Sequence, residues 1–160
     1  DGPAPIHEHV TEESAPALAP PAREPAQTKI SETAAQAQLQ AQKIQLALHG
    51  DKNQRAAILR EPNKLFHSYV LRNPQLQLEE VVFIARMPTV SIEMLTIIAG
   101  RREWAERPEV ALALVRNPKT PVPLAIRMLD HVNPNELRTL AKQQSVRDPI
   151  QRAARKKLLG

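Results

Sequence analysis

Proline recurs at short intervals through the second two-thirds of this chain. Beyond residue 50 the prolines stand at positions 62, 74, 88, 108, 118, 121, 123, 134 and 149. A proline inside a helix removes a backbone hydrogen bond and clashes with the preceding turn, so these intervals limit the length of any helix. They predict short helices over residues 51–60, 63–72, 77–86, 91–100, 108–116, 121–131, 134–143 and 149–158.

Apolar residues within these intervals recur at helical spacing. Leu124, Met128 and Leu129 are one example, and Leu65 with Tyr69 is another. The alternation of apolar and polar residues that is typical of half-buried strands is absent. We therefore predict an all-α fold of about eight short helices.

Three of the predicted helices begin at a polar residue followed by proline. Asn133-Pro134, Asp148-Pro149 and Thr120-Pro121 each put an N-capping residue type before a proline, which is favoured at the first helical position. The spacing predicts that all three polar side chains cap their helices.

The string Arg-Asn-Pro occurs twice, at residues 72–74 and 116–118, 44 positions apart. Proline disfavours helical geometry in the residue before it, so each string predicts a corner between two helices. The flanking apolar patterns also align, which indicates an internal repeat of three short helices. Such a repeat predicts an α-solenoid, in which each unit buries its apolar face against its neighbours.

The N-terminal region differs in composition. Six of the 15 prolines fall within residues 1–28. We expect a disordered Pro/Ala-rich linker over residues 1–30, an Ala/Gln-rich helix over 31–49 and the helical repeat domain over 50–160. Ala37, Ala41, Ile44 and Leu48 form a thin apolar stripe on that helix. Gly50 should end it in the left-handed conformation.

The corner Asn117-Pro118-Lys119-Thr120-Pro121 resembles that of leucine-rich-repeat-variant units, within the helical repeat class that includes HEAT repeats. The chain also resembles the C-terminal domain of an uncharacterised bacterial family. It shares the strings REW (102–104), LALVRNPKTPVPLA (112–125) and RAARKKLL (152–159). The resemblance covers about residues 50–159 and implies a right-handed stack of helices used as a binding surface. The chain has no cysteine, so the iron–sulfur module linked to the variant family is not expected.

Charge is shared unequally along the chain. Residues 1–49 hold 3 Lys/Arg against 6 Asp/Glu, whereas residues 50–160 hold 19 against 11. The basic excess favours contact with acidic proteins, nucleic acid or anionic membrane. No run of about 20 apolar residues and no N-terminal signal pattern occurs. Because the chain begins with Asp, we expect a cytoplasmic fragment of a longer bacterial protein.

The predicted function is a non-catalytic scaffold or adaptor module that captures an acidic or helical segment of another protein. Trp104 has two interpretations, an exposed anchor for a partner or a side chain that packs the junction between the repeats. The predicted partner-binding residues are Trp104, Arg101, Arg102, Arg107, Arg116, Lys119 and Arg127.

The alternative function is sequence-independent nucleic-acid binding through a basic solenoid face. Phosphate contacts would come from the last predicted helix, where cations recur at i, i+3 and i+4. The residues are Arg152, Arg155, Lys156 and Lys157. A solvated helix face explains the same pattern, and the two interpretations stay open.

Catalytic and metal-binding patterns are weak. His7-Glu8-His9 stands alone in the predicted linker, without the three or four converging ligands that a metal site needs. The serines lack the sequence context of known nucleophiles, and the four glycines form no phosphate-binding loop. We expect no enzyme activity, no cofactor and no metal.

Overall fold

The computed structural model describes residues 2–3 and 25–160, and every regular element in these residues is helical. The prediction of an all-α fold is confirmed. All eight predicted segments contain helix, and a short helix at Arg102–Ala105 is additional. The elements are α1 (Pro25–His49), α2 (Lys52–Arg60), η1 (Lys64–Phe66), α3 (His67–Val70), α4 (Leu78–Arg86), α5 (Ile92–Gly100), α6 (Arg102–Ala105), α7 (Pro108–Arg116), α8 (Val122–Met128), η2 (Leu129–His131), α9 (Pro134–Lys142) and α10 (Asp148–Leu158).

The chain divides into two compact units, residues 1–38 and 39–160. Helix α1 begins at Pro25, so the last residues of the predicted linker are helical, while residues 4–24 lie outside the described residues. In the first unit the described side chains of α1, at 29 and 31–38, are exposed. The second compact unit begins at Leu39, eleven residues before the predicted boundary at 50.

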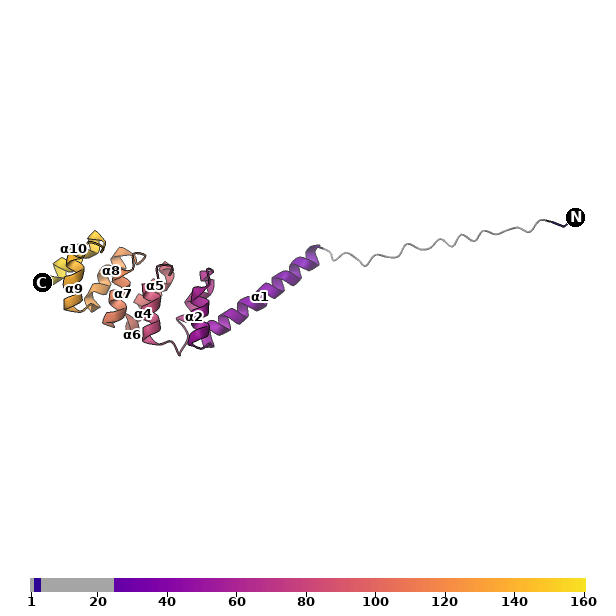
Figure 1. Cartoon of the computed structure of the whole chain (residues 1–160), viewed down its shortest axis with the longest axis horizontal. Coiled ribbons are helices and arrows are strands. Elements are labelled where there is room, and N and C mark those ends of the chain that lie inside the picture. The colour runs from indigo at the N-terminus through magenta and orange to yellow at the C-terminus, as the bar shows by residue number, and fades with distance from the viewer. Residues whose placement is uncertain (1, 4–24) are drawn as a thin grey trace. The chain divides into compact units, whose positions relative to one another are not determined.

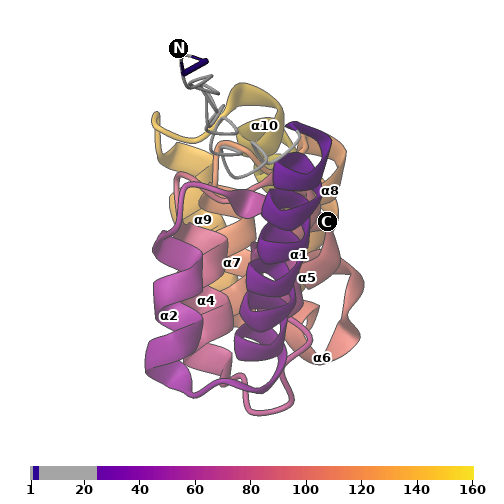
Figure 2. The same ribbon diagram turned by 90° about the vertical axis from the view of Figure 1, so that its right-hand side faces the viewer.

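Within residues 39–160 the helices form two layers. Figures 1 and 2 show α2, α4, α7 and α9 in one layer, with α5 and α8 in the other. Helix α4 packs against α7, α5 against α8, and α9 against α10. Burial of each large apolar side chain stabilises the fold by about 1.5–3 kcal/mol. The largest fully buried ones include Leu71, Ile84, Met94, Leu95, Ile98, Leu114, Leu129, Leu140 and Ile150.

The side-chain caps lie elsewhere than predicted. Asn133 occupies the N-cap of α9 but makes no side-chain capping bond, Asp148 lies inside the first turn of α10, and Pro121 is the residue before α8. The three predicted caps are therefore wrong. Proline already removes one unpaired N–H, and exposed helix starts leave the others to water. Asp51 and Ser91 are the capping side chains of α2 and α5 instead.

The two Arg-Asn-Pro strings form corners, as predicted. The asparagine side chain of each corner makes hydrogen bonds that fix the corner in place. Asn117 is 4% exposed, and its Nδ2 donates to the carbonyl oxygens of Ala85 (2.7 Å) and Met87 (3.1 Å). Its Oδ1 accepts the backbone N–H of Lys119 at 3.0 Å. One buried side chain thus fixes the α7–α8 corner to the end of α4 and sets the position of Lys119.

Asn73 makes the equivalent contacts at the first corner. Its Nδ2 donates to the carbonyl oxygens of Ala47 and Gly50, both at 3.0 Å, and its Oδ1 accepts the Gln75 N–H at 2.9 Å. Within the second unit, these bonds join the C-terminal end of α1 to the first corner. Ala47 is fully buried, whereas Ala41 of the predicted stripe is exposed.

Gly50 is required by crowding and not by a left-handed conformation. Among the described residues Gly160 alone has a positive φ. A Cβ on Gly50 would lie 2.2 Å from the carbonyl oxygen of Leu46. The expected left-handed cap is therefore wrong, because the close approach of the backbone explains the glycine.

No helix in the described part of the chain combines the length and the apolar character needed to cross a membrane.

Candidate functional site

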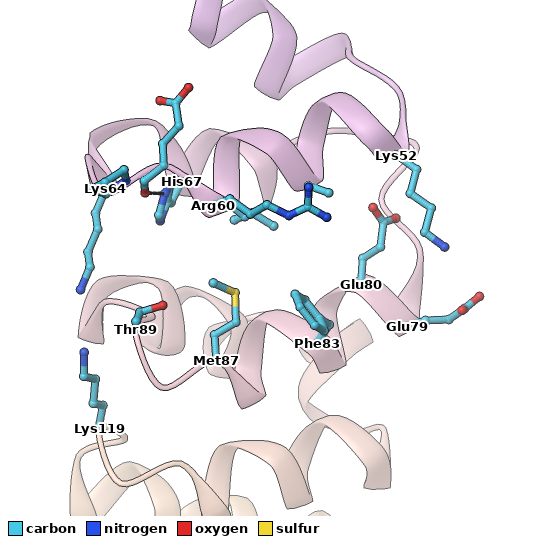
Figure 3. Close-up of a pocket in the computed structure, with 14 residues that line it drawn as sticks. Lys52, Arg60, Lys64, His67, Glu79, Glu80, Phe83, Met87, Thr89 and Lys119 are labelled. Carbon is cyan, nitrogen blue, oxygen red and sulfur yellow. Dashed lines mark hydrogen bonds between the residues drawn. The ribbon is translucent and has the colours of Figure 1, made fainter.

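A groove with a volume of about 880 Å³ lies between α2 and α4 (Figure 3). One wall is formed by α2 and the segment that follows it, and the other by α4 and the loop after it. Lys119 joins them from the α7–α8 corner. The lining residues are Lys52, Ala56, Leu59, Arg60, Glu61, Pro62, Lys64, His67, Glu79, Glu80, Phe83, Met87, Thr89 and Lys119.

The apolar floor comes from one stripe on each helix. On α2, Ala56 and Leu59 lie on the same face, because residues three and four apart are neighbours on a helix. On α4, Phe83 projects from the side opposite the buried Val81 and Ile84, and 64% of its surface is exposed. An exposed aromatic side chain on a groove floor is a candidate anchor point for a ligand.

Two of the groove's three carboxylates are already paired. Glu61 forms an ion pair with Lys43 at 2.9 Å. Glu80 accepts from the Nε (3.0 Å) and the Nη2 (2.9 Å) of Arg55, and the two side chains are 12% and 4% exposed. Arg55 also donates to the carbonyl oxygen of Gly50 at 2.8 Å. This buried network supports the groove wall.

The ionisation of Glu80 reflects two opposing effects. Burial raises the pKa of its carboxyl group, but the hydrogen bonds from Arg55 and from the Gln77 backbone N–H outweigh burial and hold the pKa below its ordinary 4.5. Glu80 is therefore ionised at neutral pH and neutralised by Arg55.

The cations of the groove are left without counter-ions. Lys52, Arg60, Lys64 and Lys119 form no ion pair with another described residue. Glu79 is the one lining carboxylate that lacks a pair there. The groove thus combines an apolar floor with a rim of net positive charge, which suits an anionic ligand with an apolar side.

His67 closes the groove from α3 and is 3% exposed. One ring nitrogen, Nε2, lies 3.0 Å from the carbonyl oxygen of Glu61. A carbonyl only accepts, so Nε2 carries the proton and donates, and Nδ1 is left as an acceptor in the neutral ring. The contact fixes the turn that follows α2.

Trp104 and Arg101 do not line the groove. Trp104 packs against the core, and the guanidinium of Arg101 lies 4.4 Å from the centroid of its ring. Arg101 also donates to the carbonyl oxygen of Leu71 at 2.9 Å, which joins α6 to the first corner. These contacts favour the packing interpretation of Trp104.

The other predicted cations are not brought into one pocket. Arg102 pairs with Glu106 at 3.0 Å and Arg116 with Glu136 at 3.5 Å, while Arg107 and Arg127 are exposed. Of the predicted partner-binding residues, Lys119 alone lines the described groove.

The cations of α10 are also partly engaged. Arg155 donates to the carbonyl oxygen of Ala141 at 3.0 Å, and Lys157 pairs with Asp130. Arg152 and Lys156 are exposed. Half of the predicted phosphate-binding set therefore has protein partners.

Thr120, beside Lys119 in the corner, provides a test of local packing. The residue is fully buried, and its Oγ1 has no hydrogen-bond partner among the described residues. Replacing an unpaired buried hydroxyl with a methyl removes a desolvation cost. We expect Thr120→Val to raise the free energy of unfolding by about 1 kcal/mol in urea denaturation.

The matched control is Thr139→Val, at an exposed position where Oγ1 donates to the carbonyl oxygen of Asn135 at 3.2 Å. This change should leave stability within about 0.5 kcal/mol. Destabilisation by Thr120→Val would show that the Thr120 hydroxyl is hydrogen-bonded after all.

Metal ligands do not converge in the described part of the chain. Among residues 2–3 and 25–160, no three His, Asp or Glu side chains lie close enough to hold an ion. His7, Glu8 and His9 lie outside the described residues.

No protein-family model, curated protein or solved structure matches the chain. The resemblance to leucine-rich-repeat-variant units therefore stays a prediction.

Proposed function

We propose that residues 39–160 form a short α-solenoid that acts as a non-catalytic protein-binding module. Its groove between α2 and α4 binds an acidic amphipathic segment of another protein. The single observation that supports this most is the pairing of an exposed apolar floor, centred on Phe83, with four cations that have no counter-ion among the described residues.

The dimensions of the groove suit a helical segment. Helices α2 and α4 have nine residues each, so each wall is about 13 Å long at ~1.5 Å per residue. A helix that presents apolar anchors at i, i+3 or i+4, and i+7 spans about 10 Å along its axis. Two or three anchor side chains would cover Leu59, Phe83 and Met87 while acidic flanks face the lysines.

Charge complementarity supports an acidic occupant. Glu61 and Glu80 are neutralised by Lys43 and Arg55, so they cannot offset the rim cations. A basic or neutral segment would leave those cations unpaired, whereas Asp or Glu beside an apolar stripe would pair with them. Rim charges of this kind raise association rates and select partners more than they raise affinity.

Peptide selection on the wild type, followed by binding measurements on one groove variant, tests the proposal. A phage-displayed library of random dodecamers is selected on the full chain, and enriched peptides are measured by fluorescence anisotropy. We expect Asp and Glu around helically spaced apolar residues. Phe83→Ala should weaken binding about 30-fold, as expected for an aromatic hot spot of ~2 kcal/mol.

The matched control is Ile92→Ala. Ile92 is 56% exposed at the start of α5 and does not line the groove. Binding to this variant should stay within about twofold of wild type. Peptides that bind Phe83→Ala as tightly as wild type, or a library that yields no specific binder, would contradict the proposal.

A further inference from the structure

Two lysines from distant parts of the chain meet at one end of the groove. Figure 3 shows Lys64, from η1, and Lys119, from the α7–α8 corner, extending toward one another. Thr89 lines the same end, and Lys52 stands at the opposite end. Asn117 holds this arrangement, since it fixes the Lys119 backbone N–H at 3.0 Å and the corner against Ala85 and Met87.

Neither Lys64 nor Lys119 forms an ion pair with a carboxylate of the described residues. The nearby Glu61 carboxylate pairs with Lys43, whose Nζ also lies 5.5 Å from the centroid of the Phe66 ring. Partial desolvation and then the charge of Lys64 lower the pKa of Lys119 from its ordinary value. Lys119 is exposed, and the charge of Lys64 repels its ammonium group. An anion bound between the two lysines would offset this repulsion.

We infer that the end of the groove marked by Lys64 and Lys119 binds a phosphoryl group carried by the docked segment, as in a phosphoserine or phosphothreonine. The inference rests on the proposed function for the identity of the partner. A phosphoryl group carries about −1.5 to −2 charges at neutral pH and three acceptor oxygens, which matches two ammonium groups with three donors each. A single carboxylate would offset only one of them.

Two small anions of the same shape and different charge test the inference on the full chain. Phenyl phosphate is close to a dianion near neutral pH and phenyl sulfate is a monoanion, and each has a ring that can lie on the apolar floor. NMR titration of the lysine side chains and backbone amides should place phenyl phosphate at Lys64 and Lys119. It should bind at least about fivefold more tightly than phenyl sulfate.

Lysine-to-glutamine variants at exposed positions test which side chains hold the anion, and none of them alters the core. Lys52→Gln is the control. Lys64→Gln and Lys119→Gln should each abolish the preference for phosphate over sulfate, whereas Lys52→Gln should retain it. Equal affinity for the two anions would overturn the inference, and so would equal losses in all three variants. An intact Phe83-dependent peptide interaction beside a failed anion preference would overturn this inference alone.

Discussion

Replacing Asn117 with Asp is expected to lower the free energy of unfolding by about 3 kcal/mol or more. The Nδ2 group that donates to the Ala85 and Met87 carbonyl oxygens, at 2.7 and 3.1 Å, becomes a carboxylate oxygen directed at two other oxygens. The site is 4% exposed, so water cannot relieve the repulsion. Urea denaturation followed by far-UV circular dichroism measures the loss.

A control variant tests whether the loss of stability is specific to the asparagine of the corner. Asn133→Ala changes an exposed asparagine at the N-cap of α9 that makes no capping bond, and should alter stability by less than about 0.5 kcal/mol. Asn117→Ala removes the donors without adding a charge and should cost about 2–3 kcal/mol. Comparable, small effects of all three changes would show that the corner is not held by its side chain.

Arg55→Leu is expected to destabilise the second unit by about 3 kcal/mol at neutral pH, because it leaves the Glu80 carboxylate, whose side chain is only 12% exposed, without its partner. The double variant Arg55→Leu/Glu80→Gln removes the stranded charge and keeps an acceptor for the Gln77 N–H, which Glu80 accepts at 2.8 Å. It should recover most of the loss. Equal stability of the single and double variants would argue against a buried ion pair.

The pH dependence of this loss follows from the lowered pKa of Glu80. A carboxyl group whose folded-state pKa lies below 4.5 contributes stability above about pH 4.5, and that contribution disappears as the pH falls through the folded value. The difference between wild type and Arg55→Leu should therefore shrink in acid. A difference that stays constant from neutral pH to strong acid would contradict the assignment to Glu80.

Helix positions could be predicted from the sequence because proline acts locally. The predicted segments 77–86 and 108–116 agree with α4 and α7 within one residue. Helix α6 was not predicted, since four residues between two corners leave no periodicity to detect. The caps at Asn133 and Asp148 were wrong because a favoured residue type does not ensure the hydrogen bond.

The groove could not be predicted, because its parts meet only in the folded chain. Lys64 and Lys119 are 55 residues apart, and no local pattern joins them. Phe83 was not predicted as a site residue, although the sequence holds a signal for it: Phe83 lies off the stripe formed by Val81 and Ile84, which leaves a large apolar side chain facing outward. Lys119, which the α7–α8 corner positions, was predicted as a partner contact. The groove that it lines was not predicted.

The most direct test of the groove as the binding site is a distance measurement on a bound peptide. A selected peptide that carries a nitroxide label is added to the isotope-labelled full chain, and amide signal loss by paramagnetic relaxation is recorded along the sequence. We expect the strongest losses in Lys52–Arg60 and Leu78–Arg86, with the α9 and α10 signals unaffected. Losses centred on Trp104, or on the Arg152–Lys157 face of α10, would contradict the proposal.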